Sequence, residues 1–170
     1  MPKVAAIIQA RVGSNRLPNK VLADLKGQSL IEFLIKRVKK CVAIDEIFLA
    51  TTQQTEDDKL EKISKRLEIT CIRGSVNDVL ARFLEITKHT NAEILIRLTG
   101  DCPLIDPELI LEIINDFKSN NYDYLSNCYP PTYPDGLDVE IFSREALIKA
   151  GLECKDSLQR EHVTPWIRDS

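Results

Sequence analysis

Short apolar runs alternate with segments of helical periodicity along the first 120 residues of the chain. The runs at residues 4–9, 47–51, 69–72 and 93–98 have the length and composition of strands that are buried on both faces. Segments that carry apolar residues at helical spacing follow each of them. Four strand–helix units in succession predict an α/β fold with a mostly parallel sheet and helices on both of its faces.

Side chains at the ends of these segments predict where the helices begin. Ser29 and Glu32 have the spacing of a capping box, and the apolar face of the helix that follows is expected to extend to Val42. The second helix is predicted over residues 55–66. Ser75 is expected to cap the third helix, and Asp106, which a proline follows, the fourth.

The pattern changes after residue 120. Strands are predicted at residues 122–126 and 137–142, on either side of a proline-rich loop at residues 129–136. Short helices are expected after Ser143 and after Asp156, and Pro165 is expected to disturb the second of these.

Composition narrows the class of protein. A chain of 170 residues suits one domain, and 44% hydrophobic with 29% charged residues is typical of a soluble globular protein. The net charge of −3 argues against the broad positive field that nucleic-acid binding needs. Five widely spaced cysteines predict neither a disulfide framework nor a zinc site, so we expect a cytoplasmic protein. We expect neither a membrane span nor a secretion signal.

The loop after the first predicted strand, residues 10–20, concentrates positive charge. Arg11, Arg16 and Lys20 suit the oxygens of a triphosphate, and Gly13 permits close approach of the backbone to a phosphate. The loop matches neither the Walker pattern nor the dinucleotide-binding glycine pattern. A solvated basic loop is an equally good interpretation of this segment by itself.

Acidic residues follow or lie on later predicted strands. Asp101, just past the strand at residues 93–98, is well placed to hold Mg²⁺ against phosphate oxygens. Asp138 and Glu140 alternate on a predicted strand and so share a face, which favours a cation between them or an exposed edge strand. His162 is a candidate base, a phosphate donor or a structural histidine.

Four segments together resemble one family. They are Ile7-Ile8-Gln9-Ala10-Arg11-Val12-Gly13-Ser14-Asn15-Arg16-Leu17-Pro18-Asn19-Lys20, Arg97-Leu98-Thr99-Gly100-Asp101-Cys102-Pro103-Leu104-Ile105-Asp106, Tyr133-Pro134-Asp135-Gly136-Leu137-Asp138-Val139-Glu140 and Arg160-Glu161-His162-Val163-Thr164. In this order they resemble the cytidylyltransferases that make CMP-activated sugars, such as CMP-acylneuraminate and CMP-KDO synthetases. The likeness is greatest to the branch named for the spore coat polysaccharide biosynthesis protein SpsF.

The resemblance implies a Rossmann-like three-layer α/β/α nucleotide-diphospho-sugar transferase fold and nucleotidyl transfer from CTP to a sugar, an acidic one, for surface polysaccharide biosynthesis. It implies Mg²⁺ as cofactor, held by Asp101 and Asp138, and it is compatible with a homodimer. It implies three sets of site residues: Arg11, Ser14, Arg16 and Lys20 for the triphosphate; Ala10, Gly13, Thr51, Arg73, Gly74, Asp78 and Gly100 around the rest of the nucleotide; and Asp135, Glu140, Glu161 and His162 towards the sugar.

Several alternatives stay open. Relatives continue past the Arg160-Glu161-His162 segment, so residues 1–170 are either a C-terminally truncated nucleotidyltransferase domain or a short natural member. The same fold could use another nucleotide such as GTP, act as a glycosyltransferase, or serve as a non-catalytic nucleotide-binding module.

Overall fold

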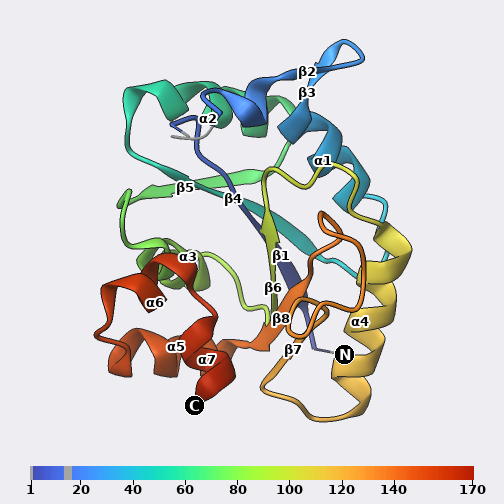
Figure 1. The fold of residues 1–170 in the computed structure, drawn as a ribbon, viewed down its shortest axis with the longest axis vertical. Coiled ribbons are helices and arrows are strands. Elements are labelled where there is room, and N and C mark those ends of the chain that lie inside the picture. The colour runs from blue at the N-terminus through green and yellow to red at the C-terminus, as the bar shows by residue number, and fades with distance from the viewer. Residues whose placement is uncertain (1, 14–16) are drawn as a thin grey trace.

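A six-stranded sheet runs through the centre of the computed structural model, which describes residues 2–13 and 17–170 (Figure 1). The strand order is β5-β4-β1-β6-β8-β7. Strands β5, β4, β1 and β6 are parallel to one another, and β8 is antiparallel to both β6 and β7. The mostly parallel sheet that the sequence predicts is thus confirmed. The strands are β1 (Val4–Gln9), β4 (Glu46–Thr52), β5 (Thr70–Gly74), β6 (Ile94–Thr99), β7 (Tyr124–Ser126) and β8 (Glu140–Ser143).

Helices cover both faces of this sheet, which gives three layers. Apolar residues of α1, α2 and α4 pack on one face, and those of α3, α5 and α7 pack on the other. In Figure 1, α6 lies with α3, α5 and α7, on the side away from α1 and α4. The helices are α1 (Leu30–Val38), α2 (Asp58–Arg66), α3 (Val79–Thr87), α4 (Pro107–Ser119), α5 (Arg144–Glu153), α6 (Ser157–His162) and α7 (Pro165–Asp169).

Strand β1 lies at the middle of the sheet and is apolar along nearly its whole length because helices cover both of its faces. Residues Val4 to Ile8 have no exposed surface. Their side chains alternate between the two hydrophobic layers, with Ala6 in one and Ile7 in the other. The strand is therefore a fixed base for the loop that follows it.

Most helix ends lie where the sequence predicts them. Ser29 and Glu32 form the expected capping box of α1, and Asp106 and Asp156 cap α4 and α6. The segment at residues 55–66 begins as the 3₁₀ turn η2 (Thr55–Asp57) before α2. Pro165 starts α7 as a separate helix instead of disturbing α6.

Three further predictions about local structure are wrong. Val42 is 88% exposed, because α1 ends at Val38 and Val42 lies in the turn that follows it. The N-cap of α3 is Asp78, whereas Ser75 only accepts hydrogen bonds from two amides in the turn before it. Strand β8 begins at Glu140, so Asp138 precedes the strand and the two carboxylates do not share a strand face.

The long loop after β1 contains short elements that the sequence pattern does not reveal. They are the 3₁₀ turn η1 (Lys20–Leu22) and a hairpin of β2 (Asp24–Leu25) and β3 (Gln28–Ser29). Among the described residues, none of the helices combines the length and the apolar character needed to cross a membrane.

Candidate active site

The order in which successive strands join the sheet changes direction at β1. The next strand along the chain, β4, pairs with one edge of β1, and β6 pairs with the other. In open parallel sheets, ligands bind beyond the carboxyl ends of the strands at such a point. The loops that leave β1 and β6 are the two segments in which the sequence predicts phosphate and metal binding.

Lys20 and Asp101 bring these two loops together. The Lys20 Nζ donates to Asp101 Oδ2 at 2.9 Å, although 81 residues separate them in the chain. Burial raises the pKa of the Asp101 carboxyl, but the hydrogen bond and the charge of Lys20 outweigh this effect and leave the pKa below its ordinary value. The carboxylate is therefore ionised at neutral pH and is held beside a cation.

A cavity of about 480 Å³ surrounds this pair. Arg11 lines it from the loop after β1, and Glu161 and His162 line it from the end of α6. A second cavity, of about 660 Å³, shares Arg11 and Glu161 with the first and extends past Gly13 to Glu56. The structure thus gathers cationic and acidic residues from three distant segments around one opening. The full lining of the first cavity is Gln9, Ala10, Arg11, Lys20, Val21, Val76, Val79, Arg82, Thr99, Gly100, Asp101, Glu161 and His162.

Gly100 lets the ends of β1 and β6 approach closely. Its amide donates to the carbonyl of Gln9 at 2.8 Å. A Cβ at this position would lie 2.7 Å from the Ala10 Cβ and 2.9 Å from the Gln9 carbonyl oxygen. Since backbone cannot yield as a flexible side chain can, only glycine fits here.

The segment before β8 adds further carboxylates. Burial, followed by the charges of Asp135 and Glu140, raises the pKa of Asp138, and the charge of Asp101 contributes in the same direction. Asp138 is therefore close enough to these three acids to be repelled by their charges. Mg²⁺ is usually held by one or two carboxylates together with substrate phosphates, so Asp101 and Asp138 are suitable ligands in chemical type. No group of three or more His, Cys, Asp or Glu side chains that could hold a metal occurs in the described ranges, so these two acids would need phosphate oxygens to complete a coordination shell.

Glu140 is committed to contacts inside the protein. It is 9% exposed and pairs with Arg97 on the neighbouring strand. It also accepts hydrogen bonds from Tyr124 Oη at 2.8 Å and from Thr164 Oγ1 at 2.5 Å. It does not line the cavity around Lys20 and Asp101, so the structure does not place it there beside Glu161 and His162.

A contact between α3 and α6 and a sharp backbone turn position Glu161 and His162 at the cavity. Asp78 caps α3 through the Ala81 amide and also accepts from Arg160, which ties α6 to α3. After His162 the chain turns sharply at Val163, whose φ of 71° is unusual for a β-branched residue. Strained backbone of this kind persists only when its surroundings hold it, and functional sites are enriched in it.

Thr51 and Arg73 do not line either cavity of this site. Arg73 forms ion pairs with Asp58 and Glu61 of α2 at 2.7 and 2.8 Å. Thr51 is fully buried, and its Oγ1 has no hydrogen-bond partner among the described residues. Their predicted contacts with the nucleotide, like those of Gly74 and Asp78, stay predictions. Ser14 and Arg16 lie outside the described residues.

Arg82 also lines the cavity, but it was not predicted from the sequence as a site residue. It occupies a position in α3 between the buried residues Val79 and Ile86, and it is itself 2% exposed. An arginine at helical spacing within an apolar face is the signal that could have identified it.

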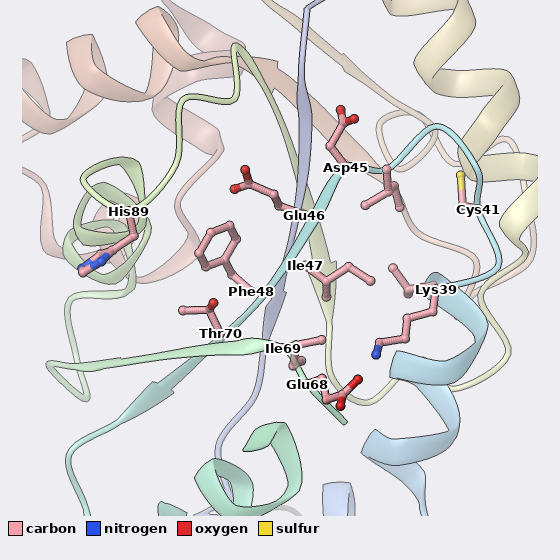
Figure 2. Close-up of a pocket in the computed structure, with 12 residues that line it drawn as sticks. Lys39, Cys41, Asp45, Glu46, Ile47, Phe48, Glu68, Ile69, Thr70 and His89 are labelled. Carbon is pink, nitrogen blue, oxygen red and sulfur yellow. The ribbon is translucent and has the colours of Figure 1, made fainter. Parts of the chain in front are cut away.

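Another cavity, of about 520 Å³, lies at the amino-terminal ends of β4 and β5, away from all predicted site residues (Figure 2). Its lysine, Lys39, donates to the Leu67 carbonyl, and Asp45 accepts from the Val4 amide at 2.7 Å. These polar groups already serve the fold, so the cavity around Lys20 and Asp101 is the better candidate site despite being smaller.

Comparisons with known proteins identify relatives over nearly the whole chain. The uncharacterized protein MJ1063 of Methanocaldococcus jannaschii is 40% identical over 99% of the chain and 68% of its own length. The spore coat polysaccharide biosynthesis protein SpsF of Bacillus subtilis is 34% identical over 99% of the chain and 71% of its own length. A 3-deoxy-manno-octulosonate cytidylyltransferase of Geobacter metallireducens is 30% identical over 66% of the chain and 43% of its own length.

A solved structure matches the whole fold. The cytidylyltransferase from Leptospira borgpetersenii superposes with a TM-score of 0.95 at 35% identity, over 100% of this chain and 72% of that one. A family model described as cytidylyltransferase matches residues 5–170. The four motifs, the three-layer fold and these matches together show that the chain belongs to the cytidylyltransferase family.

Proposed function

We propose that this protein is a Mg²⁺-dependent cytidylyltransferase that couples CTP to an acidic sugar, with release of pyrophosphate, to supply a CMP-sugar for surface polysaccharide biosynthesis. The observation that carries the proposal is the Lys20–Asp101 pair, which joins the carboxyl ends of β1 and β6 in a cavity that Arg11 also lines. Phosphoryl and nucleotidyl transfer depend mainly on positioning and on neutralising charge, and this site provides both signs of charge.

The relatives support the choice of CTP and of an acidic sugar. The Geobacter relative is by name a cytidylyltransferase acting on 3-deoxy-manno-octulosonate, which is a sugar acid. The Bacillus relative is by name a protein of polysaccharide biosynthesis. The cytoplasmic location and the homodimer compatible with the family resemblance remain predictions.

The proposed reaction is an in-line displacement at the α-phosphorus. A sugar hydroxyl oxygen forms a bond to this phosphorus while the bond to the bridging oxygen of the β-phosphate breaks. Pyrophosphate leaves with the electron pair, and the hydroxyl proton is lost to solvent. Arg11, Arg16 and Lys20 stabilise the negative charge that grows on the leaving group. For this purpose Lys20 exchanges Asp101 for a phosphate oxygen.

Asp101 and Asp138 would hold the metal ion. When bound, Mg²⁺ neutralises phosphate charge and makes the attacking hydroxyl more acidic. Burial, and then the charges of Asp135 and Glu140, raise the pKa of Asp138, and a cation held there would oppose this shift. Once Lys20 leaves Asp101 for a phosphate oxygen, the Asp101 carboxylate would also be available to hold the ion.

Glu161 and His162 are the residues best placed to contact the sugar, since both line the cavity and are exposed. Asp135 is also exposed and lies close enough to raise the pKa of Asp138. We assign Glu140 a positioning role, because it supports the turn that follows His162 through Thr164.

Pyrophosphate release tests the proposal. The protein is incubated with Mg²⁺, each nucleoside triphosphate and a panel of acidic and neutral sugars that includes 3-deoxy-manno-octulosonate. Pyrophosphate release with CTP and an acidic sugar supports the proposal. Release with GTP alone would show that GTP, and not CTP, is the substrate nucleotide. Turnover of a nucleotide sugar without pyrophosphate would indicate a glycosyltransferase. Tight CTP binding by calorimetry without turnover would indicate a binding module.

A further inference from the structure

Arg82 is a buried cation that has no hydrogen-bond partner among the described residues. Its side chain is 2% exposed, and its Nε and Nη1 atoms have no hydrogen-bond partner in the part of the chain that the structure describes. A buried charge is costly unless it is paired, so a guanidinium in this state needs an explanation.

The neighbouring charged residues do not explain why Arg82 is buried as a cation. Burial, and then the charge of Arg11, lowers the pKa of Arg82 to about 10, so the group is still cationic at neutral pH. The charges of Asp57 and Asp78 act in the opposite direction. Both carboxylates are already engaged, however. Asp57 accepts from the amides of Val12 and Thr52, at 2.7 and 3.1 Å.

Asp78 is committed in the same way. It accepts from the Ala81 amide and from Arg160, each at 2.9 Å. Arg82 therefore experiences two carboxylates at a distance but shares a hydrogen bond with neither.

The position of the side chain points to a ligand. Arg82 lines the cavity of about 480 Å³ together with Arg11, Lys20 and Asp101. Gly74 makes room for it, because a Cβ there would lie 2.8 Å from the Arg82 Cγ. The guanidinium groups of Arg11 and Arg82 thus act on one another beside the same opening, and that of Arg82 has no hydrogen-bond partner in the described part of the chain. An anion between the two groups would stabilise this arrangement.

We propose that Arg82 binds a phosphate group of the nucleotide together with Arg11, from helix α3 and outside the basic loop at residues 10–20. The identity of the nucleotide as CTP rests on the proposed function, whereas the anion-binding role rests on the unpaired guanidinium in the cavity.

Binding measurements on variants test this role. Arg82→Gln and Arg82→Lys are compared with the wild type by calorimetric titration of CTP in the presence of Mg²⁺. Cytidine, which carries no phosphate, is titrated by NMR. Arg66→Gln is the matched control, since Arg66 is an exposed arginine of α2 paired with Glu32. Thermal unfolding without ligand reports on the fold of each variant.

We expect Arg82→Gln to weaken CTP binding about 10- to 100-fold, the range that a hydrogen bond to a charged group contributes, with cytidine binding unchanged. Arg82→Lys keeps the charge but loses the planar fork, so it should bind CTP with intermediate affinity. Both variants should unfold at temperatures at least as high as the wild type, because Arg82 makes no hydrogen bond with the described residues that its loss would break. Arg66→Gln should bind CTP as the wild type does.

Unchanged CTP affinity in a folded Arg82→Gln protein would overturn the inference and leave the proposed function intact if the wild type still releases pyrophosphate. Equal losses for CTP and cytidine would show a contact with the nucleoside and would also overturn it. Arg82-dependent CTP binding without any pyrophosphate release would uphold the inference and contradict the proposed function. If the wild type binds no CTP, both are wrong. Should Arg82→Gln fail to fold, Arg82→Lys alone decides, since it preserves the charge.

Discussion

Lys20 and Asp101 show how single residues can prepare a site without adding much stability. Their side chains are 37% and 38% exposed, and a pair of this kind contributes at most about 1 kcal/mol to folding. The main effect of the pair is to hold a cation and a carboxylate in place where two strands end. Both groups can exchange partners when a nucleotide and a metal ion arrive.

Lys20→Ala should therefore affect catalysis far more than stability. We expect pyrophosphate release to slow about 10²- to 10³-fold, since the loss of one donor to developing charge raises a barrier by about 3 kcal/mol. The free energy of unfolding should change by less than about 1 kcal/mol. Lys65→Ala is the control, because Lys65 on α2 also pairs with a carboxylate, Glu61, but lines neither cavity of the site. Equal rates for the two variants would remove Lys20 from the mechanism.

Asp138→Asn should increase the stability of the fold at pH 7 and abolish activity. The folded-state pKa of Asp138 is raised by burial and then by Asp135 and Glu140, so its ionised form destabilises the fold. This cost is absent below the ordinary aspartate pKa of about 4 and grows as the pH rises through the raised folded pKa. Urea unfolding of metal-free protein should show Asp138→Asn more stable than the wild type at pH 7 and equal to it in acid, while pyrophosphate release is lost. A destabilised variant at pH 7 would show that Asp138 is held by favourable contacts instead.

Among the elements, β8 and the α6–α7 turn depend on contacts between distant parts of the chain. Glu140 joins Arg97 of β6, Tyr124 of β7 and Thr164 before α7. Thr164 in turn donates its amide to the carbonyl of His162 across the strained turn at Val163. The network therefore fixes the position of His162 at the cavity.

Thr164→Val should loosen this turn. The substitution removes a buried hydrogen bond to a charged acceptor, so we expect the free energy of unfolding to fall by about 1–3 kcal/mol in denaturant titrations. Thr70→Val, at an exposed position of β5, should change it by no more than about 0.5 kcal/mol. If both variants are equally stable, the Glu140 network does not hold the turn.

The same elements show what sequence reasoning can and cannot reach. Strand β1 and the capping box of α1 were predicted correctly because their signals are local: a continuous apolar run, and a serine three residues before a glutamate. The start of β8 and the exposure of Val42 were not, because each depends on where the chain meets the rest of the sheet. Alternation of Asp138 and Glu140 resembled a strand face, but tertiary contacts bury one and leave the other outside the strand.

At the scale of the whole molecule, the strand order creates the site. The alternation of strands and helices predicts a parallel sheet but not that β4 and β6 flank β1, and it is this order that brings Asp101 to Lys20. The family resemblance identified the loops that meet, and the structure supplies their geometry. The sequence did not predict Arg82 as a site residue. Its role follows from the lack of a hydrogen-bond partner among the described residues, and only the packed structure reveals this.

Ligand binding should stabilise the molecule as a whole, since the site joins segments from the beginning, middle and end of the described chain. Free CTP at about 100 times its dissociation constant, with Mg²⁺, should add about 2.7 kcal/mol and raise the melting temperature by about 5–10 °C. Lys20→Ala should show a smaller rise at the same CTP concentration. An unchanged melting temperature of the wild type at saturating CTP would argue against a nucleotide site.

Phosphorus NMR of the reaction mixture tests the central claim most directly, because it follows the α-phosphorus itself. Wild-type protein with Mg²⁺, CTP and an acidic sugar should convert CTP into equal amounts of a sugar phosphodiester and pyrophosphate, and Lys20→Ala should do so about 10²- to 10³-fold more slowly. Release of orthophosphate, or CTP that persists with every acidic sugar tested, would contradict nucleotidyl transfer at the junction of β1 and β6.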